Sequence, residues 1–174
     1  MRNKFKSYIF IFIISFLELK SVNANEPFVF DVTEIEILEN GNQVNGYKRG
    51  TVTSEDGSTI TAENFYYNKL TNILEAAGNI KYLDKTKNII ITANKAIYLK
   101  NNEMIYAIGN SKAVGENNTI TASNMEYDKT NNIFAAKENA VVNDIEKDIT
   151  IYADEITYLK NEEPYHFYYS AIDF

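Results

Sequence analysis

The side chains that most often carry catalysis or bind metals are scarce in this chain of 174 residues. It has no cysteine, and its one histidine is His166. A Ser/His/Asp or Cys/His catalytic system therefore lacks members, and a transition-metal site lacks its usual nitrogen and sulfur ligands. Gly78 and Gly109 are isolated and lie in predicted strands, so no glycine-rich phosphate loop is indicated. These patterns predict a protein that is not an enzyme and that holds no metal or cofactor.

Carboxylates are the one abundant reactive group, with 24 Asp and Glu residues. Glu63, Glu126, Asp154 and Glu155 fall at positions of a sequence repeat where the side chain is expected to face solvent. A solvated strand face explains them better than a pair of catalytic carboxylates. The function is therefore to be sought in the apolar residues and in the elements that position them.

The chain is organised around a motif that occurs four times. Its first copy, residues 58–68, reads S-T-I-T-A-E-N-F-Y-Y-N. Its Thr61-Ala62 pair recurs as Thr92-Ala93, Thr121-Ala122 and Tyr152-Ala153, at intervals of 31, 29 and 31 residues. Each copy has an Ile just before the pair and a Tyr five residues after its Ala. Self-similarity at a period near thirty predicts stacked structural repeats.

Each copy is predicted to be one bent β-strand. In the first copy the apolar residues are Ile60, Ala62, Phe65 and Tyr67, so the steps between them are two, three and two. Steps of two are the alternation of a strand with one buried face. The step of three is typical of a β-bulge or a bend, and the small Ala before it lets the backbone turn tightly.

A polar turn and a second alternating strand follow each copy. The turns, such as residues 100–103 and 129–132, are rich in Lys and Asn, which favours hairpin connections. In the second strands, Gly78-Asn79 and Gly109-Asn110 indicate a bulge or a close backbone approach, and Glu138-Asn139 takes their place in the third. Residues 25–57 are interpreted as a diverged leading repeat. We therefore predict an all-β domain over residues 25–163, built of stacked antiparallel hairpins with about nine long bent strands.

Residues 1–24 are predicted to be a secretory signal peptide. Three basic residues precede an apolar run of ten at residues 8–17, and Val22-Asn23-Ala24 offers cleavage after Ala24. An uncleaved membrane anchor is the alternative, but a spanning helix needs about 20 apolar residues. An exported protein without cysteine is held together without disulfides, which suits a bacterial envelope protein. We expect the mature protein in the periplasm, with association with the outer membrane as a second possibility.

The charge of the chain excludes one class of partner. The full sequence carries a net charge of −7, and removal of residues 1–24 takes away four basic and one acidic residue, which leaves −10. Such a surface repels phosphate backbones, and no basic stripe interleaved with aromatic residues is present. We therefore expect no binding to nucleic acid.

The repeat breaks off after Glu163, and residues 164–174 are predicted to form an irregular tail. One interpretation is a cap on the last sheet edge, with Pro164 blocking further strand pairing. A second is that the chain is a fragment, or a shifted reading frame, of a longer protein. A third is an alternating terminal strand of Tyr168, Ser170, Ile172 and Phe174, like those that end outer-membrane barrels.

The apolar face of the repeat has a plain interpretation as core. Its inward positions, however, mix small residues such as Ala62 and Ala76 with large ones such as Phe65. Two sheets that face each other across such rows are expected to leave an apolar groove. Stacked hairpins also leave an edge strand at each end, where another sheet can join.

Together, the repeated I-T-A-x-x-φ-x-Y motif, the Lys-Asn turns and the A-x-G-N strands behind a signal peptide resemble the OstA-like domain. That domain makes up the periplasmic lipopolysaccharide-transport protein LptA and the N-terminal periplasmic part of the outer-membrane protein LptD. The resemblance runs from about Phe28 to Glu163. It leaves open whether this chain is an LptA-like free bridge or the N-terminal piece of an LptD protein.

The resemblance implies a twisted, V-shaped β-jelly roll, or β-taco, whose interior carries lipid A acyl chains. It also implies end-to-end joining with other Lpt-type domains, copies of this chain included, by addition of edge strands. The residues expected to line the groove are Ile60, Ala62, Phe65, Tyr67, Leu74, Ile80, Ile91, Ala93, Tyr98, Ile105, Ile120, Ala122, Met125, Tyr127, Phe134, Ile151 and Ile156.

Two functions follow as hypotheses. The first is a non-enzymatic lipopolysaccharide carrier and bridge in the periplasm, which passes its cargo toward the outer membrane. The second is a ligand-free structural or adhesive β-solenoid of the cell envelope. An open apolar cleft favours the first, and a filled interior favours the second.

Overall fold

Eleven β-strands and two short 3-10 helices make up the described part of the chain, which is residues 26–159 and 167–170 of a computed structural model. The predicted signal peptide and residues 160–166 and 171–174 lie outside it. The elements are β1 (Phe28–Leu38), η1 (Glu39–Gly41), β2 (Gln43–Ser54), β3 (Thr59–Ala62), β4 (Asn64–Asn68), β5 (Ile73–Asp84), β6 (Ile89–Leu99), η2 (Lys100–Asn102), β7 (Met104–Val114), β8 (Asn118–Asp128), β9 (Ile133–Asp144), β10 (Ile149–Leu159) and β11 (Phe167–Ser170).

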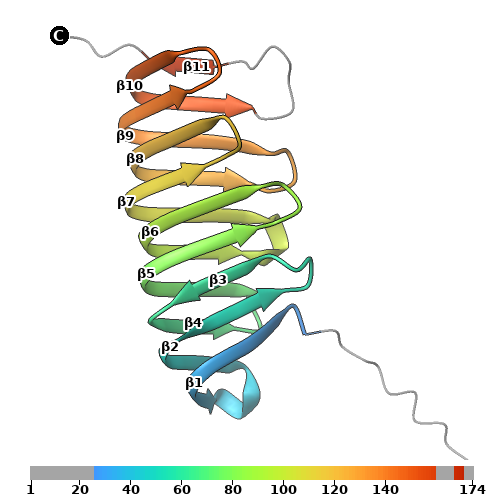
Figure 1. The fold of residues 1–174 in the computed structure, drawn as a ribbon. Helices are drawn as coiled ribbons and strands as arrows, with labels where there is room; N and C mark the ends of the chain where they lie inside the picture. The colour runs from blue at the N-terminus through green and yellow to red at the C-terminus, as the bar shows by residue number, and fades with distance from the viewer. Residues whose placement is uncertain (1–25, 160–166, 171–174) are drawn as a thin grey trace, which may run out of the picture.

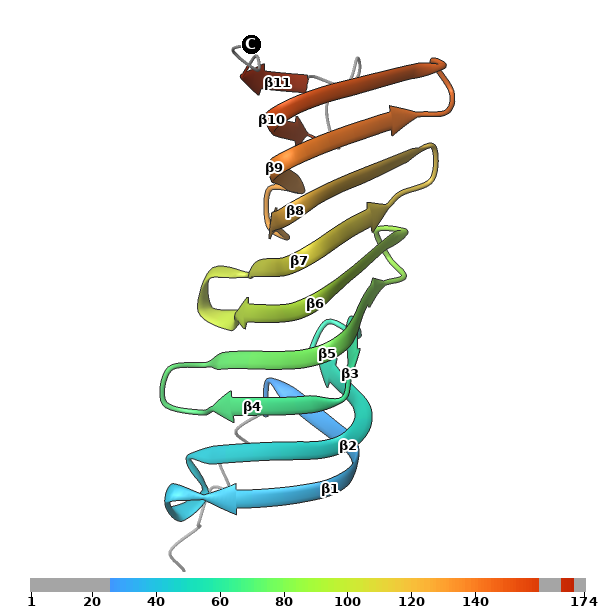
Figure 2. The same cartoon turned by 90° about the vertical axis from the view of Figure 1, so that its left-hand side faces the viewer.

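All the described strands belong to one antiparallel sheet, in which strands that follow each other along the chain pair with each other, except β3 and β4. β3 and β4 are two halves of one bent strand, because both pair with β2 on one side and with β5 on the other. When β3 and β4 are counted as one strand, β1–β10 are nine long bent strands, as the repeat predicts. The all-β, V-shaped architecture is thereby confirmed, and the strands stack into a twisted column (Figure 1, Figure 2).

The strands bend where the sequence predicts it. The pairing register shifts between Ala77 and Ile80 in β5 and between Thr92 and Lys95 in β6, and the same shift recurs further along the stack. Both members of Gly78-Asn79, Gly109-Asn110 and Glu138-Asn139 have a positive φ, from 51° to 85°. These left-handed pairs form the bulges that turn the sheet back on itself, and the bends of successive strands lie along one edge of the molecule (Figure 1, Figure 2).

The bend divides the sheet into two walls that face each other. Wall A comprises residues 43–47, 64–68, 73–77, 95–99, 104–108, 124–128, 133–137 and 155–159, and wall B comprises residues 50–54, 59–62, 80–84, 89–93, 111–114, 118–122, 140–144 and 149–153. Figure 2 looks onto the bend, with wall A on the left and wall B on the right. The hairpin turns of both walls lie along the opposite edge, which we call the rim.

The short strand β11 lies within the stretch that the sequence predicts to be irregular. It pairs with Glu155–Tyr158 of β10 and so extends the sheet of wall A by four residues. Its sequence, F-Y-Y-S, has the aromatic residues that favour strands, and an unpaired edge offers backbone groups for it to bond. The tail therefore continues the sheet over residues 167–170.

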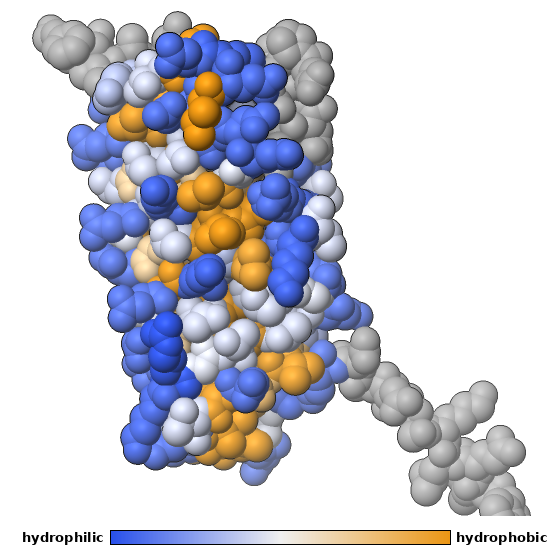
Figure 3. Space-filling model, viewed as in Figure 1, coloured by the Kyte–Doolittle hydropathy of each residue, from blue (hydrophilic) through white to orange (hydrophobic). Residues whose placement is uncertain are grey.

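The outer surface is of mixed character. The motif threonines face outward, and the hydroxyls of Thr51 and Thr61 lie 3.1 Å apart on neighbouring strands. Figure 3 shows apolar groups on this side of the column interspersed with polar and charged ones. Within residues 26–159 and 167–170, the structure has no helix long and apolar enough to cross a membrane.

Candidate functional site

The residues predicted to line a groove all come together between the two walls. Wall A contributes Phe65, Tyr67, Leu74, Tyr98, Ile105, Met125, Tyr127, Phe134 and Ile156, and wall B contributes Ile60, Ala62, Ile80, Ile91, Ala93, Ile120, Ala122 and Ile151. All but Ile151 are buried, and Ile151 is partly buried against the others. Contact of these residues with lipid stays a prediction.

Side chains fill the interior, where an open groove was the expectation. Tyr127 stacks on Phe134 with ring centroids 4.3 Å apart, and it also approaches Tyr82 of wall B at 6.3 Å. Phe28 packs edge-on against Tyr67 and Tyr98 of wall A, at 5.0 and 5.5 Å. A cavity between the walls measures about 10 Å³, room for about one water molecule, whereas ligand pockets typically reach about 300 Å³ or more.

The mixture of small and large inward residues is explained by distance from the bend. Next to the bend, the inward row of wall A contains the small residues Ala76, Ala96, Ala107 and Ala136, interspersed with the larger Phe65, Met125 and Ile156. Closer to the rim the corresponding row is Tyr67, Leu74, Tyr98, Ile105, Tyr127, Phe134 and Tyr158. In wall A the small inward side chains thus all lie at the narrow end of the V, and the inward side chains at its wide end are all large. The large side chains at the wide end leave little space there, and the cavity that they line with wall B measures only about 10 Å³.

The motif tyrosines have a second role at the rim. Tyr67 donates a hydrogen bond to Asn72 at 2.9 Å, and Tyr127 donates one to Asn132 at 3.0 Å. Tyr98 donates to the carboxylate of Glu103 in the same way. In each case the acceptor lies five residues after the tyrosine, in the following turn. Tyrosine suits this place because its ring is apolar and its hydroxyl can reach water.

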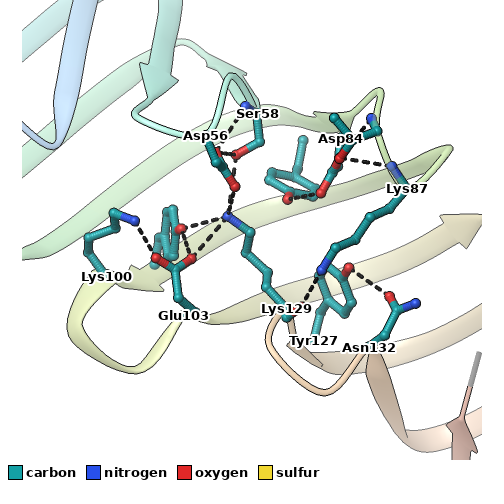
Figure 4. Close-up of polar contacts among 12 residues, drawn as sticks. Asp56, Ser58, Asp84, Lys87, Lys100, Glu103, Tyr127, Lys129 and Asn132 are labelled. Carbon is teal, nitrogen blue, oxygen red and sulfur yellow. Dashed lines mark hydrogen bonds and ion pairs between the residues drawn. The ribbon is translucent and has the colours of Figure 1, made fainter. Parts of the chain in front are cut away.

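A polar cluster at the rim, which sequence reasoning missed, is centred on Lys129. Figure 4 shows the Lys129 amino group between the two walls. On wall A its Nζ lies 2.7 Å from the Tyr98 hydroxyl and 3.1 Å from Glu103 Oε2. On the wall B side it lies 2.6 Å from Asp56 Oδ2 and 3.4 Å from Ser58 Oγ. Its side chain is only 4% exposed, so these four partners replace its water shell.

The rim cluster perturbs the carboxylates that belong to it. Burial alone would raise the pKa of Asp56, but hydrogen bonds from Lys129 and Ser58 outweigh it and hold that pKa well below its ordinary value. The pKa of Glu103 is lowered in the same way, because hydrogen bonds from Lys100, Tyr98 and Lys129 overcome the effect of burial. Burial, together with the hydrogen bond to Glu103, raises the pKa of Tyr98. The cluster is therefore built to keep both carboxylates ionised.

The signal that could have indicated this cluster is present in the sequence. Every copy of the motif has Tyr and not Phe five residues after its Ala, and each of the turns at residues 69–72, 100–103 and 129–132 ends in Asn or Glu. A recurring hydroxyl at an otherwise apolar position indicates a polar partner nearby. Asp56 and Lys129 lie 73 positions apart in the sequence, so no local pattern of residues indicates their contact.

The remaining carboxylates considered for chemistry point away from the interior. Glu63 pairs with Arg49 and Glu126 with Lys137, each at 2.7 Å between the charged atoms. Asp154 and Glu155 are exposed. No group of three or more His, Cys, Asp or Glu side chains in the described part of the chain is placed to hold a metal ion. His166 lies outside the described residues.

Comparison with known proteins identifies the family. A model of the family described as OstA-like protein matches residues 29–171. No curated protein matches the chain. Among solved structures, the chain is similar to LptH of Pseudomonas aeruginosa, described as the LptA homologous periplasmic component of the conserved lipopolysaccharide transport device. The TM-score is 0.59 at 16% identity, with 65% of this chain and 83% of LptH covered, so this likeness concerns the fold. Because the family model spans most of its length, the chain belongs to the family of OstA-like proteins.

Proposed function

We propose that the protein is a non-enzymatic carrier of lipopolysaccharide, which acts in the periplasm as part of a bridge toward the outer membrane. The observation that carries the proposal is the OstA-like family match over residues 29–171. The fold shared with LptH, a periplasmic component of a lipopolysaccharide transport device, supports it. The basic and apolar leader at residues 1–24, with cleavage after Ala24, would supply export to the periplasm.

The cargo would be held by its acyl chains. The inward rows run the length of the column, so acyl chains could lie between the walls once these separate at the rim. Burial of apolar surface contributes about 25 cal/mol per Å² of favourable free energy, and this would favour entry of an acyl chain between the walls. The net charge of −10 on the mature chain disfavours phosphate groups, so the head group would stay in water outside the rim.

Assembly into a bridge would use the edge strands. β1 pairs with β2 on one side, and it carries exposed apolar side chains at Val29, Ile35 and Ile37. An edge strand with apolar side chains is a template for strand addition. We propose that another Lpt-type jelly-roll domain, or a further copy of this chain, adds there.

The filled interior favours a second candidate function, that of a ligand-free structural or adhesive β-solenoid in the cell envelope. Core residues such as Phe65, Leu74 and Tyr127 have 0% exposure, as they would in a protein that never opens. The two candidates differ in whether the interior meets lipid.

Photocrosslinking separates the two. A photoreactive phenylalanine analogue would replace Phe65 or Phe134 inside the walls, and in a control it would replace Glu63 on the outer face. Lipopolysaccharide captured from Phe65 or Phe134 and not from Glu63 supports the carrier. Capture from Glu63 alone, or from none of the three in correctly folded protein, favours the solenoid.

A further inference from the structure

The two walls are joined by different kinds of contact at their two edges. At the bend the chain itself passes from one wall to the other in every long strand. At the rim, the backbone hydrogen bonds between turns join neighbours on the same wall, as from Lys129 N to Glu103 O at 3.0 Å and from Ile145 N to Asn117 O at 2.8 Å. The contacts that cross from wall to wall at the rim are made by side chains.

The crossings of this kind in the described part of the chain include the following three. The first is the ion pair of Lys129 with Asp56. The second is the amino group of Lys87, in a turn of wall B, which donates to the backbone carbonyl of Lys129 (Figure 4). The third is Asn118 of wall B, whose amide donates to the Tyr158 hydroxyl of wall A at 2.7 Å. Asn118 and Tyr158 also line the cavity of about 10 Å³ between the walls.

The central crossing can release without leaving a buried charge unpaired. Lys129 keeps Glu103 and Tyr98 as partners on its own wall, and its amino group lies 4.8 Å from the centre of the Tyr98 ring. Asp56, on the opposite turn, is already 43% exposed, so it can return to water with little penalty. A buried pair is costly to break when one partner is left behind alone, and the arrangement around Lys129 avoids that cost.

We propose that the contacts around Lys129 form a latch that holds the walls together at the rim, and that its release opens the interior to an acyl chain. The closed state is the one seen here, with walls in contact. The open state keeps every backbone hydrogen bond of the sheet and separates only side chains at the rim. The second half of the proposal rests on the proposed function, because it names the point of entry for the same cargo.

The latch itself can be tested without lipid. The chain has no cysteine, so spin labels on Glu55→Cys and Thr130→Cys, both exposed and on opposite sides of the rim, would be its only thiol-bound probes. Lys129→Met keeps the apolar stem and removes the charge. We expect a longer and broader distance between the labels in this variant. Lys137→Met is the control, since it makes the same substitution in an ion pair of similar length, 2.7 Å against 2.6 Å, on the outer face of wall A, and it should leave the distance unchanged.

Entry of an acyl chain is tested by uptake of a fluorescent long-chain fatty acid. Lys129→Met should take up the probe several-fold more strongly than the unmodified protein or Lys137→Met. Asp56→Asn serves as a second variant if Lys129→Met folds poorly, because it breaks only the crossing and leaves Lys129 with Glu103. A reversible thiol crosslink between Asp56→Cys and Lys129→Cys should abolish uptake, and reduction of the crosslink should restore it.

The outcomes are distinct. Uptake that is unaffected by the crosslink, or a label distance that neither Lys129→Met nor Asp56→Asn changes, overturns the latch. A longer distance together with probe uptake, but no lipopolysaccharide captured from Phe65 or Phe134, keeps the latch and refutes the lipopolysaccharide carrier.

Discussion

The bend and the rim hold the same two walls together by opposite means. At the bend, pairs of left-handed residues recur at one place in successive hairpins, and the covalent chain makes the connection. At the rim, Lys129 contacts a residue 73 positions away in the sequence. The bend is therefore specified many times over by local sequence, whereas the rim depends on a few individual side chains.

The rim is therefore the edge at which we expect the two walls to separate. Opening at the bend would break bulges and ladder hydrogen bonds in strand after strand. Opening at the rim would break side-chain contacts, among them the ion pair of Lys129 with the partly exposed Asp56, and would leave the ladder hydrogen bonds of the sheet in place. Variants that weaken the bend, the packing between the walls or the rim one at a time test this difference between the bend and the rim.

The largest effect is expected from the packing between the walls close to the bend. Phe65 has 0% exposure and lies edge-on to Phe30 at 6.2 Å. Phe65→Ala should lower the free energy of unfolding by about 3–5 kcal/mol, because it leaves a cavity in a filled core. Urea denaturation measures this. Tyr66→Ala is the control on the outer face, where the side chain is 42% exposed, and an equal loss there would contradict the assignment of inside and outside.

A smaller loss is expected at the bend itself. Gly109 has a φ of 79°, and a Cβ placed on it would come within 2.8 Å of the Asn94 side chain. Gly109→Ala should therefore destabilise by about 1–2 kcal/mol, the cost of a left-handed conformation for a residue with a Cβ, plus the contact with Asn94. Thermal unfolding measures the loss. A second substitution, Asn94→Ser, should recover the part that is due to the contact.

A substitution at Glu138 is expected to raise the stability of the protein. Glu138 occupies the place of Gly78 and Gly109 in a later hairpin and has a φ of 63°. Glu138→Gly removes about 1–2 kcal/mol of backbone strain from the folded state. It also increases the conformational entropy of the unfolded chain, which lowers stability by about 0.4–1 kcal/mol. We expect a net stabilisation of about 0.5 kcal/mol, seen as a higher denaturation midpoint in urea. A loss of stability would mean that the Glu138 side chain has a role of its own at the bend.

The smallest effect is expected from acid at the rim. Asp56 and Glu103 have pKa values below their ordinary values of 3.8 and 4.5, so their contribution to stability is complete above those values and declines as the pH falls through the lowered ones. Lys100, Lys129 and Tyr98 are the charged and titratable groups that face these carboxylates. The labels at positions 55 and 130 should keep their spacing at about pH 5 and separate only well below about pH 4. Separation near neutral pH would contradict the shifts.

Much of the fold was predictable because its signals are local. The steps of two and three around Ile60, Ala62 and Phe65 predicted strand, bend and inward face together, and Gly78-Asn79 predicted a bulge. Both patterns depend only on the backbone geometry of adjacent residues. Their repetition at a period near thirty made the prediction of strands and bends reliable. The inward placement of all the residues predicted to line a groove has the same origin.

Local residue patterns specify the strands, their bends and their inward faces, and they identify the family to which the chain belongs. The distance between the walls and the contacts that close the rim follow only from the packing of the whole sheet. The angle between the walls depends on the combined volume of side chains from strands distant in sequence, graded from Ala76 near the bend to Tyr67 near the rim. The contact between Lys129 and Asp56 exists only at that angle, so no local pattern of residues could encode it.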